Sequence, residues 1–186
     1  MTLAAETVAD ILGTDTNTNF PNANVVMGTD GDDTITGTSG SDLIASFGGT
    51  DIVNGLAGND KILGGAGVDT LNGGDDNDHL YGYAGADILN GNAGDDLIYG
   101  GKDDDTIDGD AGDDFLYGEA GDDTITSGAG NDTLDGGLGD DTFIIDSGSG
   151  TKTVSGSAGT DTLNINLGTG LETFTSPVSY THLRAH

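Results

Sequence analysis

An aspartate recurs at every ninth residue through the middle of this 186-residue chain. The members of the series are Asp33, Asp42, Asp51, Asp60, Asp69, Asp78, Asp87, Asp96, Asp105, Asp114, Asp123, Asp132 and Asp141. Carboxylates are hard oxygen ligands for cations. They also repel one another, by roughly 1 kcal/mol for a pair about 5 Å apart in water. The chain itself supplies little balancing charge, because 33 acidic residues stand against four Lys and Arg, for a formal net charge of -29.

The acidic residues are biased toward the shorter side chain, since Glu6, Glu119 and Glu172 are the only glutamates. A solvating acidic segment has no physical reason to prefer aspartate, so the bias indicates a defined geometry. The absence of cysteine excludes disulfides and thiolate metal sites. No apolar run reaches membrane-spanning length, so we expect no transmembrane segment. The strongly negative charge predicts no nucleic-acid partner.

The aspartates belong to thirteen consecutive nonapeptides between Gly28 and Ile144, among them GTDGDDTIT, GGAGVDTLN, GNAGDDLIY and GEAGDDTIT. Position six is the aspartate, position eight is always apolar, and position four is glycine except at Asp76 and Asp103. Glycines at positions one and four are expected to allow positive φ and close backbone approach, so that the first six residues form a tight loop. The three residues that follow are β-prone, which predicts a short strand with position eight as its only core contact.

Strands this short are stable only when successive turns stack, which predicts a solenoid. Position nine indicates how many units make one turn. Its tyrosines fall in alternate units and its asparagines in the intervening ones: Tyr81, Tyr99 and Tyr117, then Asn54, Asn72 and Asn90. Strands one turn apart lie about 4.8 Å from each other, so residues separated by two units would stack on one face. The sequence therefore predicts an all-β fold, a parallel β-roll wound as a right-handed solenoid with two nonapeptides per turn.

Stacked turns also stack the aspartates, so a cation must lie between them. Lys61, Lys102 and Lys152 are too few for that role. Carboxylates and freed loop carbonyls form an irregular all-oxygen environment, which suits Ca²⁺ better than Mg²⁺. We predict multiple Ca²⁺ ions as cofactor and the thirteen aspartates as their ligands. Seven loops on one edge and six on the other leave six and five gaps, hence at most eleven sites, and fewer if Asp76 and Asp103 disturb their loops.

These units resemble the GGxGxDxUx nonapeptide of the RTX, or hemolysin-type, calcium-binding repeats. The likeness covers Gly28 to Ile144 and extends to one further unit, GSAGTDTLN, from Gly156 to Asn164. The resemblance implies a parallel β-roll that holds Ca²⁺ between successive loops of the same edge, through position-six carboxylates and backbone carbonyls. It also implies a secreted, extracellular bacterial protein that is exported by type I secretion machinery.

No enzymatic activity is expected, because the chain contains neither HExxH nor GxSxG. His79 stands at outward position seven of its unit, which predicts a solvated surface residue. The predicted function is a secreted calcium-binding module that folds on binding Ca²⁺ outside the cell, with a structural, adhesive or secretion-supporting role. Its further partners are expected to be a neighbouring domain or a cell-surface ligand. The alternative is the C-terminal repeat fragment of a larger secreted enzyme or toxin, such as a protease, lipase, epimerase or cytolysin.

Four segments are expected along the chain: a polar leader or linker (1–24), the β-roll (25–144), closing strands with one further repeat (145–177), and a terminal segment (178–186). The terminal segment, VSYTHLRAH, contains the only arginine and matches no repeat position. It resembles the translated read-through of a sequencing adaptor, so we expect the natural chain to be cut short near Pro177, without any C-terminal secretion signal.

Deletion of residues 178–186 is expected to leave calcium-induced folding unchanged, because the segment carries no repeat signature. Calcium titration followed by circular dichroism measures the effect, and a deletion that also removes the repeat at 156–164 serves as the positive control. A clear loss of stability in the shorter deletion would show that the segment belongs to the fold.

Overall fold

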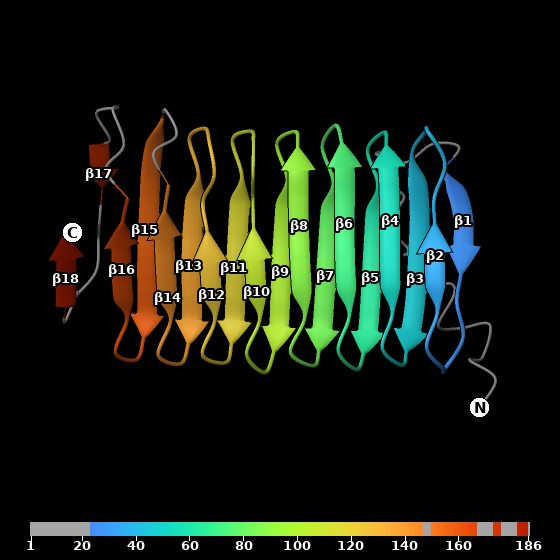
Figure 1. Ribbon diagram of the computed structural model, residues 1–186, viewed down its shortest axis with the longest axis horizontal. Helices are drawn as coiled ribbons and strands as arrows, with labels where there is room; N and C mark the ends of the chain where they lie inside the picture. Colours follow the sequence, from blue (N-terminus) through green and yellow to red (C-terminus); the bar gives the residue numbers. More distant parts are fainter. Residues whose placement is uncertain (1–22, 147–149, 167–172, 176–181, 186) are drawn as a thin grey trace.

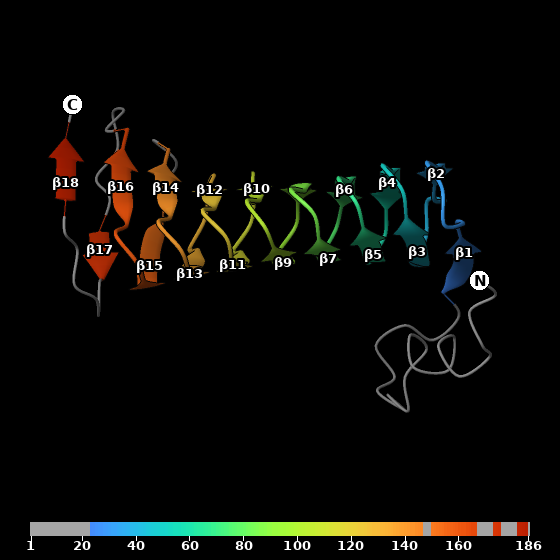
Figure 2. The ribbon, with the colours of Figure 1, turned by 90° about the horizontal axis from the view of Figure 1, so that it is seen from below.

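The structure, a computed structural model, describes residues 23–146, 150–166, 173–175 and 182–185. Two nine-stranded parallel sheets face each other, and the chain alternates between them strand by strand (Figures 1 and 2). Sheet A contains the odd-numbered strands: β1 (Asn24–Met27), β3 (Asp42–Gly48), β5 (Lys61–Ala66), β7 (His79–Ala84), β9 (Leu97–Lys102), β11 (Phe115–Ala120), β13 (Thr133–Leu138), β15 (Thr151–Ala158) and β17 (Thr173–Thr175). Sheet B contains the even-numbered strands: β2 (Thr34–Thr36), β4 (Ile52–Ala57), β6 (Thr70–Asp75), β8 (Ile88–Ala93), β10 (Thr106–Asp108), β12 (Thr124–Thr126), β14 (Thr142–Ile145), β16 (Thr162–Ile165) and β18 (His182–Ala185).

This arrangement confirms the predicted all-β parallel β-roll. Within the described ranges, no helix is long and apolar enough to cross a membrane.

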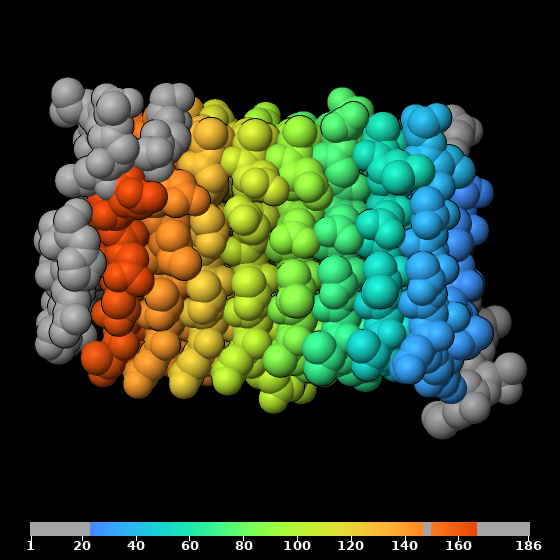
Figure 3. Space-filling view, viewed as in Figure 1, coloured from blue at the N-terminus to red at the C-terminus, as the bar shows by residue number. Residues whose placement is uncertain are grey.

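The register of both sheets confirms two nonapeptides per turn. Leu80 pairs with Ile98 in sheet A and Leu71 with Leu89 in sheet B, each eighteen residues further along the chain. Near the C-terminal end the step becomes twenty residues, as in the pairing of Leu134 with Val154. The two additional residues leave the strand pairing parallel. Successive turns consequently pack in regular columns along the roll (Figure 3).

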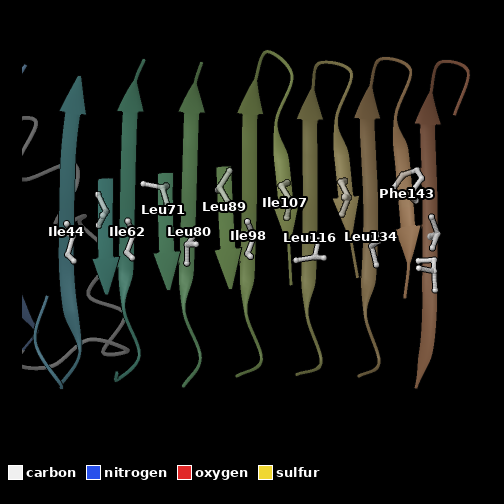
Figure 4. Packing of buried hydrophobic residues seen from close by; sticks show 14 of the residues in the cluster. Ile44, Ile62, Leu71, Leu80, Leu89, Ile98, Ile107, Leu116, Leu134 and Phe143 are labelled. Carbon is white, nitrogen blue, oxygen red and sulfur yellow. The ribbon is translucent and has the colours of Figure 1, made fainter. Parts of the chain in front are cut away.

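The core is a double row of position-eight side chains between the sheets (Figure 4). All thirteen predicted core residues are buried: Ile35, Ile44, Val53, Ile62, Leu71, Leu80, Leu89, Ile98, Ile107, Leu116, Ile125, Leu134 and Phe143. Val154 and Leu163 extend the two rows into the last turns. Each fully buried side chain of this size stabilises the fold by about 1.5–3 kcal/mol, so every strand contributes one comparable increment.

Strands β2, β10 and β12 have the three residues that the sequence predicts, whereas many of the others are longer. In β7, for example, the strand covers positions seven to nine of one unit and continues through positions one to three of the next, so that the loop shrinks to positions four to six. Position one therefore lies inside a strand. A Cβ atom at Gly82 would stand 2.5 Å from both the Gly100 carbonyl oxygen and Asp87 Oδ2. Close approach, rather than positive φ, explains the glycine at this position, so that part of the prediction was wrong.

Positive φ instead occurs at positions two and four. Position two tolerates side chains in this conformation, as at Leu56 (φ 91°) and Tyr83 (φ 78°), at a cost of about 1–3 kcal/mol each. At position four, Asp76 and Asp103 adopt φ of 76° and 74° where most other units place glycine. The two substituted loops therefore keep the backbone path of their neighbours.

The ends of the roll follow the same register. Asn24 pairs with Asp42 and Val26 with Ile44, so β1 continues sheet A in the register of the repeats. Residues 1–22 of the predicted leader lie outside the described residues. At the other end β16 pairs with β18, so residues 182–185 of the terminal segment form a strand at the edge of sheet B. The proposed origin of that segment stays a prediction.

The outer face of sheet A carries the predicted tyrosine ladder. The rings of Tyr81 and Tyr99 stack with centroids 5.2 Å apart, and those of Tyr99 and Tyr117 with centroids 4.8 Å apart. Lys61 Nζ lies 5.4 Å from the centroid of the Tyr81 ring, which extends the column by a cation–π contact. On sheet B, Asn90 and Asn72 donate side-chain hydrogen bonds to Asn72 and Asn54, respectively, one turn earlier.

Changing both Tyr99 and Tyr117 to Thr is expected to lower the melting temperature of the calcium-loaded roll, because each stacked pair contributes about 0.5–1.5 kcal/mol beyond its burial. We expect a shift of roughly 2–4 °C per kcal/mol, measured by thermal denaturation. Phe115→Thr is the control, since Phe115 is 50% exposed on the same strand as Tyr117. Unchanged melting together with lost association with a partner would instead identify the ladder as a docking face.

Candidate metal sites

The position-six aspartates lie inside the roll, where each loop enters its strand. The twelve from Asp42 to Asp141 are at most 2% exposed, and Asp33 in the first turn is half-buried. The prediction that position eight is the only inward-facing position was therefore wrong. Two carboxylate rows flank the apolar rows, one along each edge of the roll.

One oxygen of each carboxylate joins consecutive turns. Oδ1 of Asp96 accepts a hydrogen bond from the backbone N–H of Asp78 at 2.7 Å, and the N–H of Asp96 donates to Oδ1 of Asp114 at 2.8 Å. The same type of hydrogen bond, 2.7–3.1 Å long, joins each position-six aspartate to the one in the next turn. The series runs from Asp33 to Asp161 along one edge and from Asp42 to Asp132 along the other. Sequence spacing placed these residues one above another but did not reveal this contact.

The second oxygen, Oδ2, is buried and accepts no hydrogen bond in eleven of these side chains, and in one of them, Asp132, it forms an ion pair instead. The other ten are Asp51, Asp60, Asp69, Asp78, Asp87, Asp96, Asp105, Asp114, Asp123 and Asp141. In the first turn the atom is satisfied, because Oδ2 of Asp33 and of Asp42 accepts the backbone N–H of Thr29 and Thr38, respectively. An unsatisfied buried polar atom costs about 1–3 kcal/mol, and more if it is charged, so these rows require a positive partner.

One loop contains such a partner. Lys152 Nζ lies 2.8 Å from Asp132 Oδ2 and donates a hydrogen bond to the Gly130 carbonyl oxygen at 2.7 Å. A carboxylate oxygen and a position-four carbonyl thus bind a cation together. Throughout the described residues, no three His, Cys, Asp or Glu side chains lie close enough to hold a metal ion by themselves. Loop carbonyls must therefore complete any site, which fits an oxygen-binding cation such as Ca²⁺.

Burial also changes the acidity of these groups. It raises the pKa of Asp78 and Asp105 to about 8, and the carboxylates of neighbouring turns raise it further while the backbone N–H of the preceding turn opposes the shift. The same causes act elsewhere in the rows, giving pKa values of about 7 at Asp87, Asp96 and Asp114 and about 6 at Asp60, Asp123 and Asp141. At neutral pH the ionised rows oppose folding unless a cation offsets them.

A second set of carboxylates faces outward at position five. Oδ1 of Asp95 accepts the N–H of Asp113 one turn later, and Asp104 and Asp122 are linked in the same way, each bond 2.8 Å long. These bonds run opposite to those of position six, so the loops are tied in both directions. Sequence reasoning did not find this role, although Asp or Asn at position five was its visible signal. His79, predicted to be solvated, is half-buried beside Lys61, and burial lowers its pKa.

Two parallel sheets with a buried acidic row along each edge define a β-solenoid with candidate cation ligands in its interior. The family model for the RTX calcium-binding nonapeptide repeat matches residues 21–46, 27–62, 46–80, 63–98, 81–116 and 108–143. The chain belongs to this family and is a calcium-binding β-roll that takes multiple Ca²⁺ ions. No curated protein matches it.

Without calcium, lowering the pH from about 8 to about 5.5 is expected to favour the folded roll. The folded-state pKa values of Asp78 and Asp105 exceed the ordinary aspartate value of 3.8, so the folded chain binds more protons than the unfolded chain in this interval. The free energy of unfolding therefore rises as protons neutralise the rows. Circular dichroism in EDTA at the two pH values measures the change.

Asp78→Asn and Asp105→Asn provide the matched test, because asparagine keeps an acceptor oxygen and never ionises. The double variant should show more β-structure than the wild type in EDTA at pH about 8 and a smaller response to acid. A β-signal that weakens on acidification would contradict the proposed cause.

Proposed function

We propose that the thirteen position-six aspartates, Asp33 to Asp141 at nine-residue intervals, are the calcium ligands of this roll, together with loop carbonyls. The observation that carries the proposal is the repeated Oδ2 atom, buried and unpartnered from Asp51 to Asp123 and at Asp141, and matched by an ammonium group at Asp132. Bound Ca²⁺ supplies the positive charge that these atoms lack, and the aspartates hold the ions between loops that are already in register.

Calcium binding and folding are one process in this proposal. A chain of net charge -29 with stacked carboxylates has a strong electrostatic reason to stay unfolded until cations arrive. Since no complete site exists in an unfolded chain, the free energy of ion binding becomes free energy of folding. Extracellular calcium modules operate at dissociation constants of about 10⁻⁴–10⁻³ M, which would keep the chain unfolded in the cell and fold it outside.

The protein is proposed to act as a secreted, non-enzymatic module with a structural or adhesive role, or as a support for type I secretion. Membership of the RTX family supports this reading, because such repeats are typical of secreted bacterial proteins. Residues 25–144 form the proposed functional roll and residues 145–177 its closing strands. A neighbouring domain or a cell-surface ligand is the proposed further partner.

In EDTA at neutral pH the far-UV spectrum is expected to be coil-like, and millimolar Ca²⁺ should produce a β-signal that equal Mg²⁺ does not. The site residues are tested by a matched pair. Asp96→Asn removes a buried charge, whereas Asp95→Asn removes the same charge from the exposed neighbour. We expect Asp96→Asn to weaken calcium-dependent folding by about 1–3 kcal/mol and Asp95→Asn to change it much less.

Equilibrium dialysis then counts the ions, which should be several per folded chain and at most eleven for the thirteen predicted units. A folded spectrum in EDTA would falsify the coupling of folding to calcium. Only one or two ions per folded chain would rule out the stacked-loop sites, and equal effects of the two asparagine variants would rule out position six as the ligand.

A further inference from the structure

Residues 150–155 form part of a repeat that the nine-residue spacing hides. Gly150 has a φ of 125°, as position four requires, and the N–H of Thr151 donates to Asn131 Oδ1 at 3.0 Å, the position-five bond of the other loops. Thr153 pairs with Thr133, and Val154 is buried at position eight. The two-residue insertion shifted this unit out of the sequence pattern. Lys152 consequently stands at position six, in the place of an aspartate.

The side chain of Lys152 is fully buried. Its ammonium contacts Asp132 Oδ2 at 2.8 Å and the Gly130 carbonyl at 2.7 Å. These oxygens belong to the two groups, the position-six carboxylate and the position-four carbonyl, that every preceding loop offers. Lysine has three donors and no acceptor, so it cannot continue the Oδ1 bond that Asp132 makes to Asp114. It is suited to neutralise the row rather than to extend it.

The opposite edge of the roll provides an internal comparison. There the last described loop carries Asp161, whose Oδ1 accepts the N–H of Asp141 at 3.1 Å, so the row continues as before. Neither Asp141 Oδ2 nor Asp132 Oδ2 accepts a hydrogen bond, but Asp132 Oδ2 has the ion pair with the lysine. Among the described loops the two edges therefore differ, because the edge of Asp132 continues with a lysine and the edge of Asp141 with an aspartate.

We propose that Lys152 is a resident cation that replaces calcium between the loops that precede β13 and β15. This inference rests on the proposed calcium sites of the preceding loops. Because the ammonium is covalently part of the chain, the contact between β13 and β15 forms without free calcium. This turn is thereby ordered at a lower calcium concentration than the turns before it.

Substitution of Lys152 separates the possible roles. Lys152→Asp restores the family residue at position six and should add about one bound Ca²⁺ per chain in equilibrium dialysis, while more calcium is needed to reach half-folding. Lys152→Met keeps an unbranched side chain, one atom shorter and without charge, so the ion count should stay unchanged and the calcium midpoint should rise several-fold. Lys102→Asp and Lys102→Met are the matched controls, because Lys102 is exposed and the changes in charge are identical.

Hydrogen exchange at subsaturating calcium provides a readout that does not depend on the ion count. In the wild type, the backbone amides of β13 and β15 should be protected at calcium concentrations where those of β3 and β5 still exchange. Lys152→Met should abolish this early protection, and saturating calcium should restore the fold in each variant.

The outcomes distinguish this inference from the proposed function. A wild type that binds no calcium overturns both. A wild type that binds calcium, combined with an unchanged ion count in Lys152→Asp, or with Lys152 variants that behave like the Lys102 controls, overturns only the role of Lys152. Simultaneous protection of all strands in the wild type overturns the early ordering of the contact between β13 and β15.

Discussion

Two rows of carboxyl groups buried in a fold with almost no positive charge are the constraint on which this structure depends. In ten of the position-six aspartates, for example Asp78 and Asp96, Oδ1 joins the turn to the preceding turn and Oδ2 has neither a proton donor nor an ion pair. The bond that aligns the turns is therefore inseparable from the charge that drives them apart. At neutral pH a cation between the loops satisfies both demands, so in the proposed sites the ion is a part of the interior rather than an addition to the surface.

The backbone is shaped to bring these oxygens close together. Position one must be small, because the next turn and the aspartate of the same unit occupy the space of a side chain, as at Gly82. Positions two and four turn the chain with positive φ, even where the residue is Leu56 or Asp103. Each strand buries its position-eight side chain in the core, so apolar burial adds a similar stabilising free energy in every turn. The charges of the two carboxylate rows therefore decide whether the roll folds.

The features that repeat with a fixed period could be predicted from the sequence, namely the core at position eight, the two units per turn and the ladders of Tyr81 and Asn72. Their period is visible because each unit must match its neighbours. The inward orientation of the aspartates could not be predicted, since a polar residue beside a glycine-rich loop is expected to face water. Lys152 escaped detection because two inserted residues interrupt the count and only the register of β15 restores it.

Because every turn offers its neighbours the same contacts, the length of the roll is free to vary in whole turns. Removing or duplicating eighteen residues between 28 and 144 would leave the pairings on either side of the cut as they are now, for example with Leu71 taking over the partner of Leu89. A change of nine residues would exchange the two sheets for all that follows and set tyrosines against asparagines. The repeat thus favours evolutionary growth and shortening in pairs of units.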